Sequence, residues 1–191
     1  MVFITLNEII GIIAVTVIVG YILSGYIQRP KSAFESLYKK PSFIDWDDLK
    51  FSMIISAPAI ILHELGHKFV GMAFGLPSIF KAFWGGLGLG VVLKMIGSPF
   101  IVLAPAYVQF AQGATPLQHV IIAFAGPGIN LILWLGSAAY IKFSKNKHSR
   151  NTMIALMLTK KINMILFIFN MIPFPPLDGY HIFSNLYQLI L

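Results

Sequence analysis

Long apolar stretches decide what this chain can fold into. Hydrophobic residues make up 57% of its 191 residues and charged residues only 11%, whereas about a quarter of the residues in soluble domains are charged. The chain therefore has too few charged side chains to cover a surface that faces water. Because a helix needs roughly 20 apolar residues to cross a bilayer, the sequence predicts an α-helical integral membrane protein with about four transmembrane spans.

Polar, mostly basic loops separate the expected spans. The spans cover about residues 8–27, 51–75, 117–141 and 162–191, the last of them broken at 173–177. Between the second and third spans, the segment 76–116 is rich in glycine and in short β-prone runs such as 89–93, 100–103 and 107–110. Such runs, interrupted by turn residues, are typical of strands. We therefore expect a short membrane-associated β segment there.

The first span lies close to the first residue, so a cleavable signal peptide is the competing interpretation. A cleavable signal starts with basic residues, and this chain starts with Met-Val-Phe-Ile-Thr. We therefore expect an uncleaved span and a single membrane-embedded core over residues 1–191, with no separate soluble domain. The chain has no cysteine, which excludes disulfides and cysteine-ligated metal sites.

The second span contains the motif His63-Glu64-Leu65-Gly66-His67. Two histidines four residues apart lie on the same face of a helix, so both imidazoles can reach one zinc ion. Glu64 lies beside that metal, where a carboxylate can take a proton from water. Many such motifs in soluble helices arise by chance. Within a membrane span the motif indicates function, because ionisable groups are costly in lipid.

The last span supplies a candidate third ligand. The prolines at 173–176 interrupt it, and backbone freed at membrane depth is tolerated only where it is buried in protein or lines a wet cavity. Of the seven acidic residues, only Glu64 and Asp178 lie well inside the expected spans. A hydrolytic zinc site needs three protein ligands and an open position, so Asp178 is the expected third ligand. Asn170, a neutral amide at a similar depth, can donate to a developing oxyanion.

Several of these polar residues have a competing structural interpretation. Asp178 opens the final helical stretch and also suits a helix N-cap, a role that is compatible with metal binding. Asn170 also suits pairing with backbone groups that the prolines free. Asn130 in the third span is more typical of helix packing than of catalysis. His181 as a fourth ligand would close the position that water needs, so we expect a supporting or packing role for it.

Taken together, these residues resemble the site-2 proteases, a family of intramembrane zinc metalloproteases. Three blocks carry the resemblance: His63-Glu64-Leu65-Gly66-His67, Gly126-Pro127-Gly128-Ile129-Asn130 and the stretch 170–179. The resemblance implies that His63, His67 and Asp178 bind one Zn²⁺ ion per chain. It also implies that Glu64 acts as general base and then general acid, and that Asn170 helps to stabilise the tetrahedral intermediate.

The resemblance further implies the reaction and the partners. The enzyme would hydrolyse peptide bonds within transmembrane segments of membrane-protein substrates, as in regulated intramembrane proteolysis. The substrate would bind as an unwound, extended segment, clamped by strand addition to the β segment. The lipid bilayer is the other expected partner. Nucleic acid is not expected, because the basic residues flank the spans instead of forming a patch with interleaved aromatics.

Two other classes of function remain open. A membrane transport or metal-handling protein would also place histidine, aspartate and a broken helix near the midplane. The glutamate beside the first histidine favours hydrolysis, however, and the sequence shows no paired repeat. A catalytically inactive relative that binds substrates would keep the fold without the chemistry, but this sequence retains all the expected ligands and the base.

The orientation in the membrane is predicted differently by charge and by family. Of 14 lysines and arginines, 11 lie in residues 28–50 and 142–161, which share one side of the membrane if there are four spans. The positive-inside rule places these loops in the cytoplasm. The family resemblance instead places the active-site end toward the cytosol. In either orientation we expect a multi-pass protein of the cell membrane.

Overall fold

The computed structural model describes residues 4–31, 35, 44–98, 105–110, 113–145 and 148–191. Within these residues the elements follow in the order α1 (Leu6–Leu23), α3 (Trp46–Ala73), β1 (Ser78–Ala82), α4 (Trp84–Met95), β2 (Ala106–Phe110), α5 (Pro116–Phe143), α6 (Arg150–Asn170) and α7 (Asp178–Ile190). Helices α1, α3, α5 and α6 are each long and apolar enough to cross a membrane. The predicted helical membrane fold, with a small sheet between the second and third spans, is therefore confirmed.

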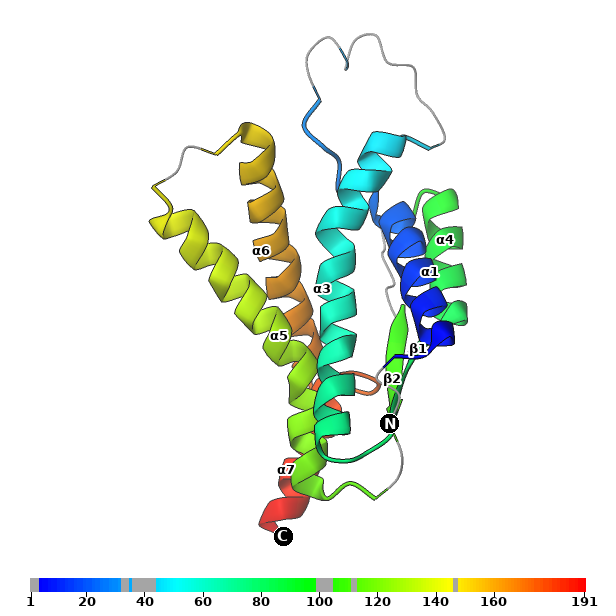
Figure 1. Cartoon of the computed structure of the whole chain (residues 1–191), viewed down its shortest axis with the longest axis vertical. Coiled ribbons are helices and arrows are strands. Elements are labelled where there is room, and N and C mark those ends of the chain that lie inside the picture. The colour runs from blue at the N-terminus through cyan, green and yellow to red at the C-terminus, as the bar shows by residue number, and fades with distance from the viewer. Residues whose placement is uncertain (1–3, 32–34, 36–43, 99–104, 111–112, 146–147) are drawn as a thin grey trace.

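Helix α3 lies at the centre of the molecule (Figure 1). It packs against α1 on one side and α5 on the other, and α5 also packs against α6 and α7. Helices α3 and α6 start at one end of the molecule, whereas the sheet and the C-terminus lie toward the other. Buried side chains of α1 and α3, among them Val15, Val19, Ile55 and Ile60, form the main core with Phe80 of β1. The sheet is thus anchored on the two helices.

Strands β1 and β2 pair in antiparallel fashion, with Phe80 opposite Val108. The strand predicted at 107–110 is therefore found. The predicted run at 100–103 lies outside the described residues.

The prediction of a β-like run at 89–93 is wrong, because this run lies inside helix α4. Glycine and β-branched residues are poor helix formers. However, Gly86 and Gly90 lie buried one turn apart, and α4 packs against α1. Small residues let helices approach closely in lipid, and a helix satisfies its own backbone donors and acceptors. These two effects outweigh the weak helix propensity.

Helix α3 begins at Trp46, before the expected start of the second span at residue 51. The carboxylate of Asp45 accepts hydrogen bonds from the backbone N–H groups of Asp47 and Asp48, which satisfies donors that a helix start leaves free. The acidic first turn also suits the positive end of the helix dipole. Local capping thus extends the helix into the polar loop.

Helix α6 begins at Arg150, earlier than the expected fourth span at residue 162. The lysines at 160 and 161 do not end the helix, because lysine is a good helix former and both side chains are exposed. The helix ends at Asn170, just before the prolines, and the separate helix α7 follows. The predicted break at 173–177 is therefore present, but it separates two helices instead of interrupting one span.

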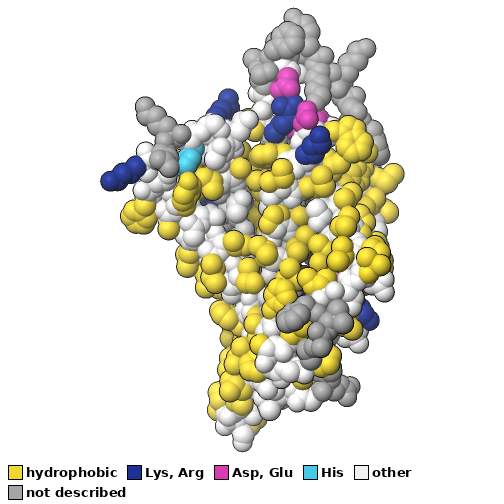
Figure 2. Space-filling model, viewed as in Figure 1, with side chains coloured by type: hydrophobic (Ala, Val, Ile, Leu, Met, Phe, Trp, Pro, Cys, Tyr) yellow, Lys and Arg dark blue, Asp and Glu magenta, His cyan; other side chains and the backbone are white. Residues whose placement is uncertain are grey.

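Charged side chains gather at the end of the molecule where α3 and α6 start, and hydrophobic side chains cover much of the remaining face (Figure 2). At this end Arg29 pairs with Glu35 at 2.6 Å, and Lys31 pairs with Asp48 at 2.8 Å. The hydrogen bond to the Asp48 carboxylate raises the pKa of Lys31, so Lys31 stays charged at neutral pH. This distribution suits an apolar band in lipid with a charged end in water.

Candidate metal centre

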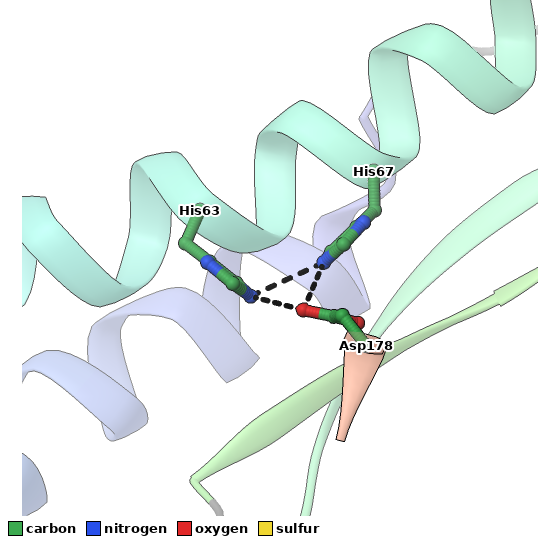
Figure 3. A group of neighbouring side chains, drawn as sticks. All are labelled: His63, His67 and Asp178. Carbon is green, nitrogen blue, oxygen red and sulfur yellow. Dashed lines mark hydrogen bonds and ion pairs between the residues drawn. The ribbon is translucent and has the colours of Figure 1, made fainter. Parts of the chain in front are cut away.

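Three side chains from two helices converge on one point (Figure 3). His63 and His67 project from the same face of α3, and Asp178 is the first residue of α7. The Nε2 atoms of the two histidines lie 3.1 Å apart. Asp178 Oδ2 lies 3.2 Å from Nε2 of His63 and 3.3 Å from Nε2 of His67. The structure thus brings together the three residues that the sequence singles out as metal ligands.

The three atoms form a nearly equilateral triangle whose size suits a metal ion. Zinc binds nitrogen and oxygen ligands at about 2.0–2.2 Å in tetrahedral sites, which places the ligand atoms roughly 3.3–3.6 Å apart. The observed separations of 3.1, 3.2 and 3.3 Å are close to these values. A tetrahedral site with three protein ligands leaves one position open for water or substrate.

Hydrogen bonds on the far side of each imidazole determine which ring nitrogen faces the triangle. His63 Nδ1 lies 2.7 Å from Asn130 Oδ1, and His67 Nδ1 lies 2.7 Å from the carbonyl oxygen of Ile122. Both partners are acceptors, so each Nδ1 carries the proton and donates it. In a neutral imidazole the lone pair is then on Nε2. Both histidines therefore direct lone pairs at the centre of the triangle.

The Asp178 carboxylate completes a set of atoms that needs a cation. Its Oδ2 is buried and has no hydrogen-bond partner within the described part of the chain. The alternative role as an N-cap is not seen, because the N-cap of α7 is Leu177 and no side chain caps this helix. Two nitrogen lone pairs and a carboxylate oxygen at about 3 Å repel one another unless positive charge lies between them. The donor set therefore fits a bound metal ion.

Two buried amide side chains hold the Nδ1 side of the His63 ring, which faces away from the triangle. Asn130 and Asn163 are both fully buried. Asn130 donates through Nδ2 to Ala59 O at 3.0 Å and to Asn163 Oδ1 at 2.9 Å, which leaves its Oδ1 free to accept from His63. The network joins α3, α5 and α6. The sequence predicts only packing for Asn130 and assigns nothing to Asn163, although a buried amide in an apolar helix always needs partners.

Gly126 of α5 leaves the space that the two imidazoles occupy. A Cβ atom at this position would lie 2.3 Å from Nε2 of His67 and 2.8 Å from Nε2 of His63. Contacts this short are not tolerated, and the neighbouring atoms are the proposed ligand atoms themselves. The glycine in the third span is therefore part of the architecture of the site.

Gly179 plays a similar part for Asp178. A Cβ atom at Gly179 would lie 2.5 Å from backbone atoms of Met171 and Ile172. The missing side chain lets the start of α7 pack directly on the end of α6, across the proline-rich turn. This close packing places Asp178 opposite the histidines.

Two cavities adjoin the triangle. A polar cavity of about 320 Å³ is lined by all three converging side chains and by Glu64, which is 8% exposed. A larger and mostly apolar cavity of about 520 Å³ shares His63 and Asn170 with it and extends between α3, α6 and the sheet. Part of β2 lines both cavities. The site thus offers a polar compartment for water beside an apolar one.

Asn170 lies at the boundary of the two cavities. Its Nδ2 donates to the carbonyl oxygen of Leu166, one turn earlier in α6, at 3.0 Å. The carbonyl oxygen of Leu166 is not one that the prolines free, because its helical donor is the N–H of Asn170 itself. An amide nitrogen carries two hydrogens, so the second remains available to a ligand in the cavity.

Two further histidines line the polar cavity. His119 comes from the first turn of α5 and His181 from the first turn of α7. Neither belongs to the group of side chains close enough to share one metal ion, as far as the described residues show. The ring of His181 lies edge-on to that of the preceding residue, Tyr180, and the supporting or packing role expected for His181 stays a prediction.

The fold and the site together define a multi-pass membrane protein with a buried His–His–Asp centre beside a glutamate. The sequence model of peptidase family M50 matches residues 138–191, a segment that contains Asn170 and Asp178. The chain belongs to this family, the site-2 protease family. No solved structure matches the chain significantly.

Three relatives extend the similarity over about two thirds of the chain. The protein named "Putative zinc metalloprotease MJ0611" of Methanocaldococcus jannaschii is 34% identical over 67% of this chain and 66% of its own length. "Putative zinc metalloprotease YwhC" of Bacillus subtilis is 29% identical over 72% of this chain and 68% of its own. "Putative zinc metalloprotease sll0528" of Synechocystis is 29% identical over 67% of this chain, which spans only 29% of that protein.

Proposed function

We propose that this chain is a zinc metallopeptidase that hydrolyses peptide bonds within transmembrane segments of other membrane proteins. The observation that carries the proposal is the triangle of His63, His67 and Asp178, which shares a cavity with Glu64. The histidines and the glutamate belong to a helix able to cross a membrane. The names of the relatives support zinc as the metal. The cell membrane is the proposed location.

The metal ligands have separate tasks in this proposal. His63 and His67 offer neutral rings, each held in place by its Nδ1 hydrogen bond, and Asp178 adds a negative charge. Bound zinc supplies a Lewis acid that lowers the pKa of water toward 7 and polarises a carbonyl oxygen. The triangle leaves one open side for these reactants.

Glu64 is the proposed proton carrier. Its carboxylate takes a proton from the attacking water and later delivers it to the nitrogen of the leaving amine. It lies in the polar cavity with the ligands and is almost fully buried. Few other water molecules can therefore reach Glu64 and accept the proton before the leaving amine does.

Asn170 is the proposed oxyanion donor. Asn170 lines the polar cavity and its Nδ2 has a second hydrogen besides the one donated to Leu166, which can donate to the carbonyl oxygen of the substrate as negative charge develops there. An amide suits this role because it stays neutral at any physiological pH.

Strand β2 is the proposed binding edge for an extended substrate. Phe80 donates its N–H to Glu8 at 2.7 Å, so its peptide groups point away from β2. In an antiparallel pair the groups of its partner, Val108, then point away from β1. In the described part of the chain no third strand covers this outer edge, and Ala106, Tyr107 and Val108 line the polar cavity. A substrate strand added here would pass the metal site.

The proposed substrate must unwind before it is cut. A carbonyl within a helix is hydrogen-bonded and packed, so neither β2 nor an attacking water can reach it. Substrates with helix-breaking residues near the scissile bond are therefore favoured.

Metal content and cleavage, measured on the same samples, test the proposal. The purified chain is reconstituted with a panel of single-span reporter proteins that carry central Gly-Pro pairs. We expect about one zinc per chain and cleavage of some reporters. Glu64→Gln should retain zinc and lose activity by about 10²-fold or more, whereas Asp178→Ala should lose both zinc and activity. Ser52→Ala, buried on the same helix, is the matched control and should behave like the wild type.

Two results would contradict the proposal. One is a wild-type protein without stoichiometric zinc, and the other is cleavage that persists in Glu64→Gln. Zinc flux across liposomes that survives Glu64→Gln would favour the transport alternative.

A further inference from the structure

Two charged side chains that the proposed chemistry does not use lie buried against each other between α1 and α3. Glu8 is 2% exposed and Lys68 is 1% exposed, and Lys68 Nζ lies 2.5 Å from Glu8 Oε1. Both residues belong to helices able to cross a membrane. Because buried charges are costly in lipid, the pair needs an explanation beyond helix packing.

The ion pair binds the outer edge of β1. Lys68 Nζ donates to the carbonyl oxygen of Ser78 at 2.9 Å, and the N–H of Phe80 donates to Glu8 Oε1 at 2.7 Å. Ser78 and Phe80 are alternate residues of the strand, so these groups point to the same edge, the one that faces away from β2. The two side chains therefore take the place of a third strand.

Glu8 also takes part in capping the N-terminus of α1. Its Oε2 accepts from the backbone N–H of Thr5 at 2.8 Å and from the Thr5 hydroxyl at 3.0 Å. With Lys68 and Phe80 on Oε1, the carboxylate uses its full acceptor capacity of about four hydrogen bonds. The Glu8 side chain thus connects the first turn of α1, Lys68 of α3 and strand β1.

The contacts continue from this pair to the metal site. Lys68 follows His67 directly in α3, and β1 carries β2 through the pairing of Phe80 with Val108. Val108 in turn lines the polar cavity together with His67. The position of the free edge of β2 relative to the metal ligands therefore depends on how β1 is held on α3.

Helix packing alone does not require these charges. Replacing a buried ion pair with apolar residues of similar size is often neutral or stabilising. Such a replacement would leave Ser78 C=O and Phe80 N–H unpaired, however, and buried unpaired groups drive the backbone to other positions. What the charges add is a defined position for β1.

We propose that Glu8 and Lys68 are positioning residues: they hold the sheet on α3 so that the free edge of β2 presents an extended substrate to the metal site. This inference rests on the proposed function for the substrate, but the placement of the sheet can be measured without any substrate.

A distance measurement tests the placement directly. Because the chain has no native cysteine, spin labels can be attached at Ile54→Cys on α3 and Ile79→Cys on β1, both of them exposed positions. Lys68→Met alone would strand a buried carboxylate and unfold the protein, so the test uses the double variant Glu8→Met/Lys68→Met. We expect this variant to fold with a lowered Tm, because the cap at Thr5 and two polar groups of β1 lose their partners, and to show a broadened or two-component distance distribution.

Two control variants make the distance result specific. Lys68→Arg, made in the otherwise wild-type chain, keeps the charge and the hydrogen-bond donors and should show the same narrow distance distribution as the wild type. Ser52→Ala, buried on α3 away from the sheet, should leave the distribution unchanged. A narrow wild-type distribution in the folded double variant would overturn the proposal.

Kinetics with a cleaved reporter protein test the consequence for the substrate. The double variant should raise KM several-fold with kcat and zinc content unchanged, because the metal ligands and Glu64 are untouched. A lower kcat at unchanged KM would overturn the positioning role. Failure of the wild type to cleave any reporter would count against the proposed function, and the distance measurement would still decide whether the pair positions the sheet.

Discussion

The orientation of His63 depends on a single buried amide. Asn130 Oδ1 accepts the Nδ1 proton of His63 at 2.7 Å and is itself held by Asn163. We expect Asn130→Ala to lower zinc affinity about 10–100-fold, the usual loss when a residue behind a metal-bound histidine is removed. Competition with a chelator on the purified protein measures this. Asn130→Asp keeps an acceptor and should lose less, and equal affinity in Asn130→Ala and the wild type would show that His63 needs no such support.

The two imidazoles of the metal site also require that residue 126 has no side chain. Gly126→Ala places a methyl group against the Nε2 atoms of both histidines, so we expect loss of bound zinc and of activity. Gly136→Ala on the same helix meets nothing within 4 Å and should retain both. Elemental analysis of the two variants measures the zinc, and stoichiometric zinc in Gly126→Ala would refute the steric argument.

Sequence reasoning reached the converging residues but not what surrounds them. The four-residue spacing of His63 and His67 indicates a shared helix face, and the scarcity of acids leaves few candidates besides Asp178. The tasks of Asn130 and Gly126 depend instead on how α5 packs against α3. That arrangement brings together residues more than 50 positions apart, and no local pattern in the sequence encodes it.

At the scale of elements, helix α6 forms one wall of the apolar cavity. Leu166 lines this cavity beside His63 and Asn170, so a large apolar substrate side chain next to the scissile bond has room there. Leu166→Trp should fill part of this space and reduce cleavage of reporters with Leu or Phe at that position by about 10-fold or more, with zinc retained. Ile165→Trp, on the exposed side of the same helix, is the matched control. Equal losses in both variants would argue against the cavity as a binding pocket.

Hydropathy predicts helices α1, α3 and α5 well, and helix α4 and the start of α6 poorly. Helices α1, α3 and α5 lie close to the expected spans because length and apolar content suffice to define them. Propensity alone predicts a strand at 89–93, whereas in lipid the backbone must pair within a helix and helix α4 packs against α1 with Gly86 and Gly90 buried. The expected fourth span starts at residue 162, after the two lysines, whereas helix α6 starts at Arg150, because lysines on the exposed side of a helix do not end it.

At the scale of the whole molecule, the fold places both basic connections at one end (Figure 1). The architecture of the family predicts that this end faces outward. Carboxylates already neutralise Arg29 and Lys31 there, which weakens the opposing charge argument. Lys145→Cys, in the connection from α5 to α6, should therefore react with a membrane-impermeant maleimide from outside intact cells. Labelling only in inverted vesicles would instead support the positive-inside rule.

The metal should also hold the whole molecule together, because its proposed ligands come from both the central helix and the last one. Asp178 starts α7, and repulsion from the imidazole lone pairs opposes its position when no cation is present. An ion that binds only the folded state stabilises it by RT ln(1 + [L]/Kd), roughly 4 kcal/mol at a free zinc concentration a thousand times Kd. We expect EDTA to lower Tm and to speed hydrogen exchange in residues 179–190 while α1 stays protected. Asp178→Ala should show fast exchange in α7 with or without EDTA. Uniform loss of protection, or no change in Tm, would mean that the ion does not join α7 to α3.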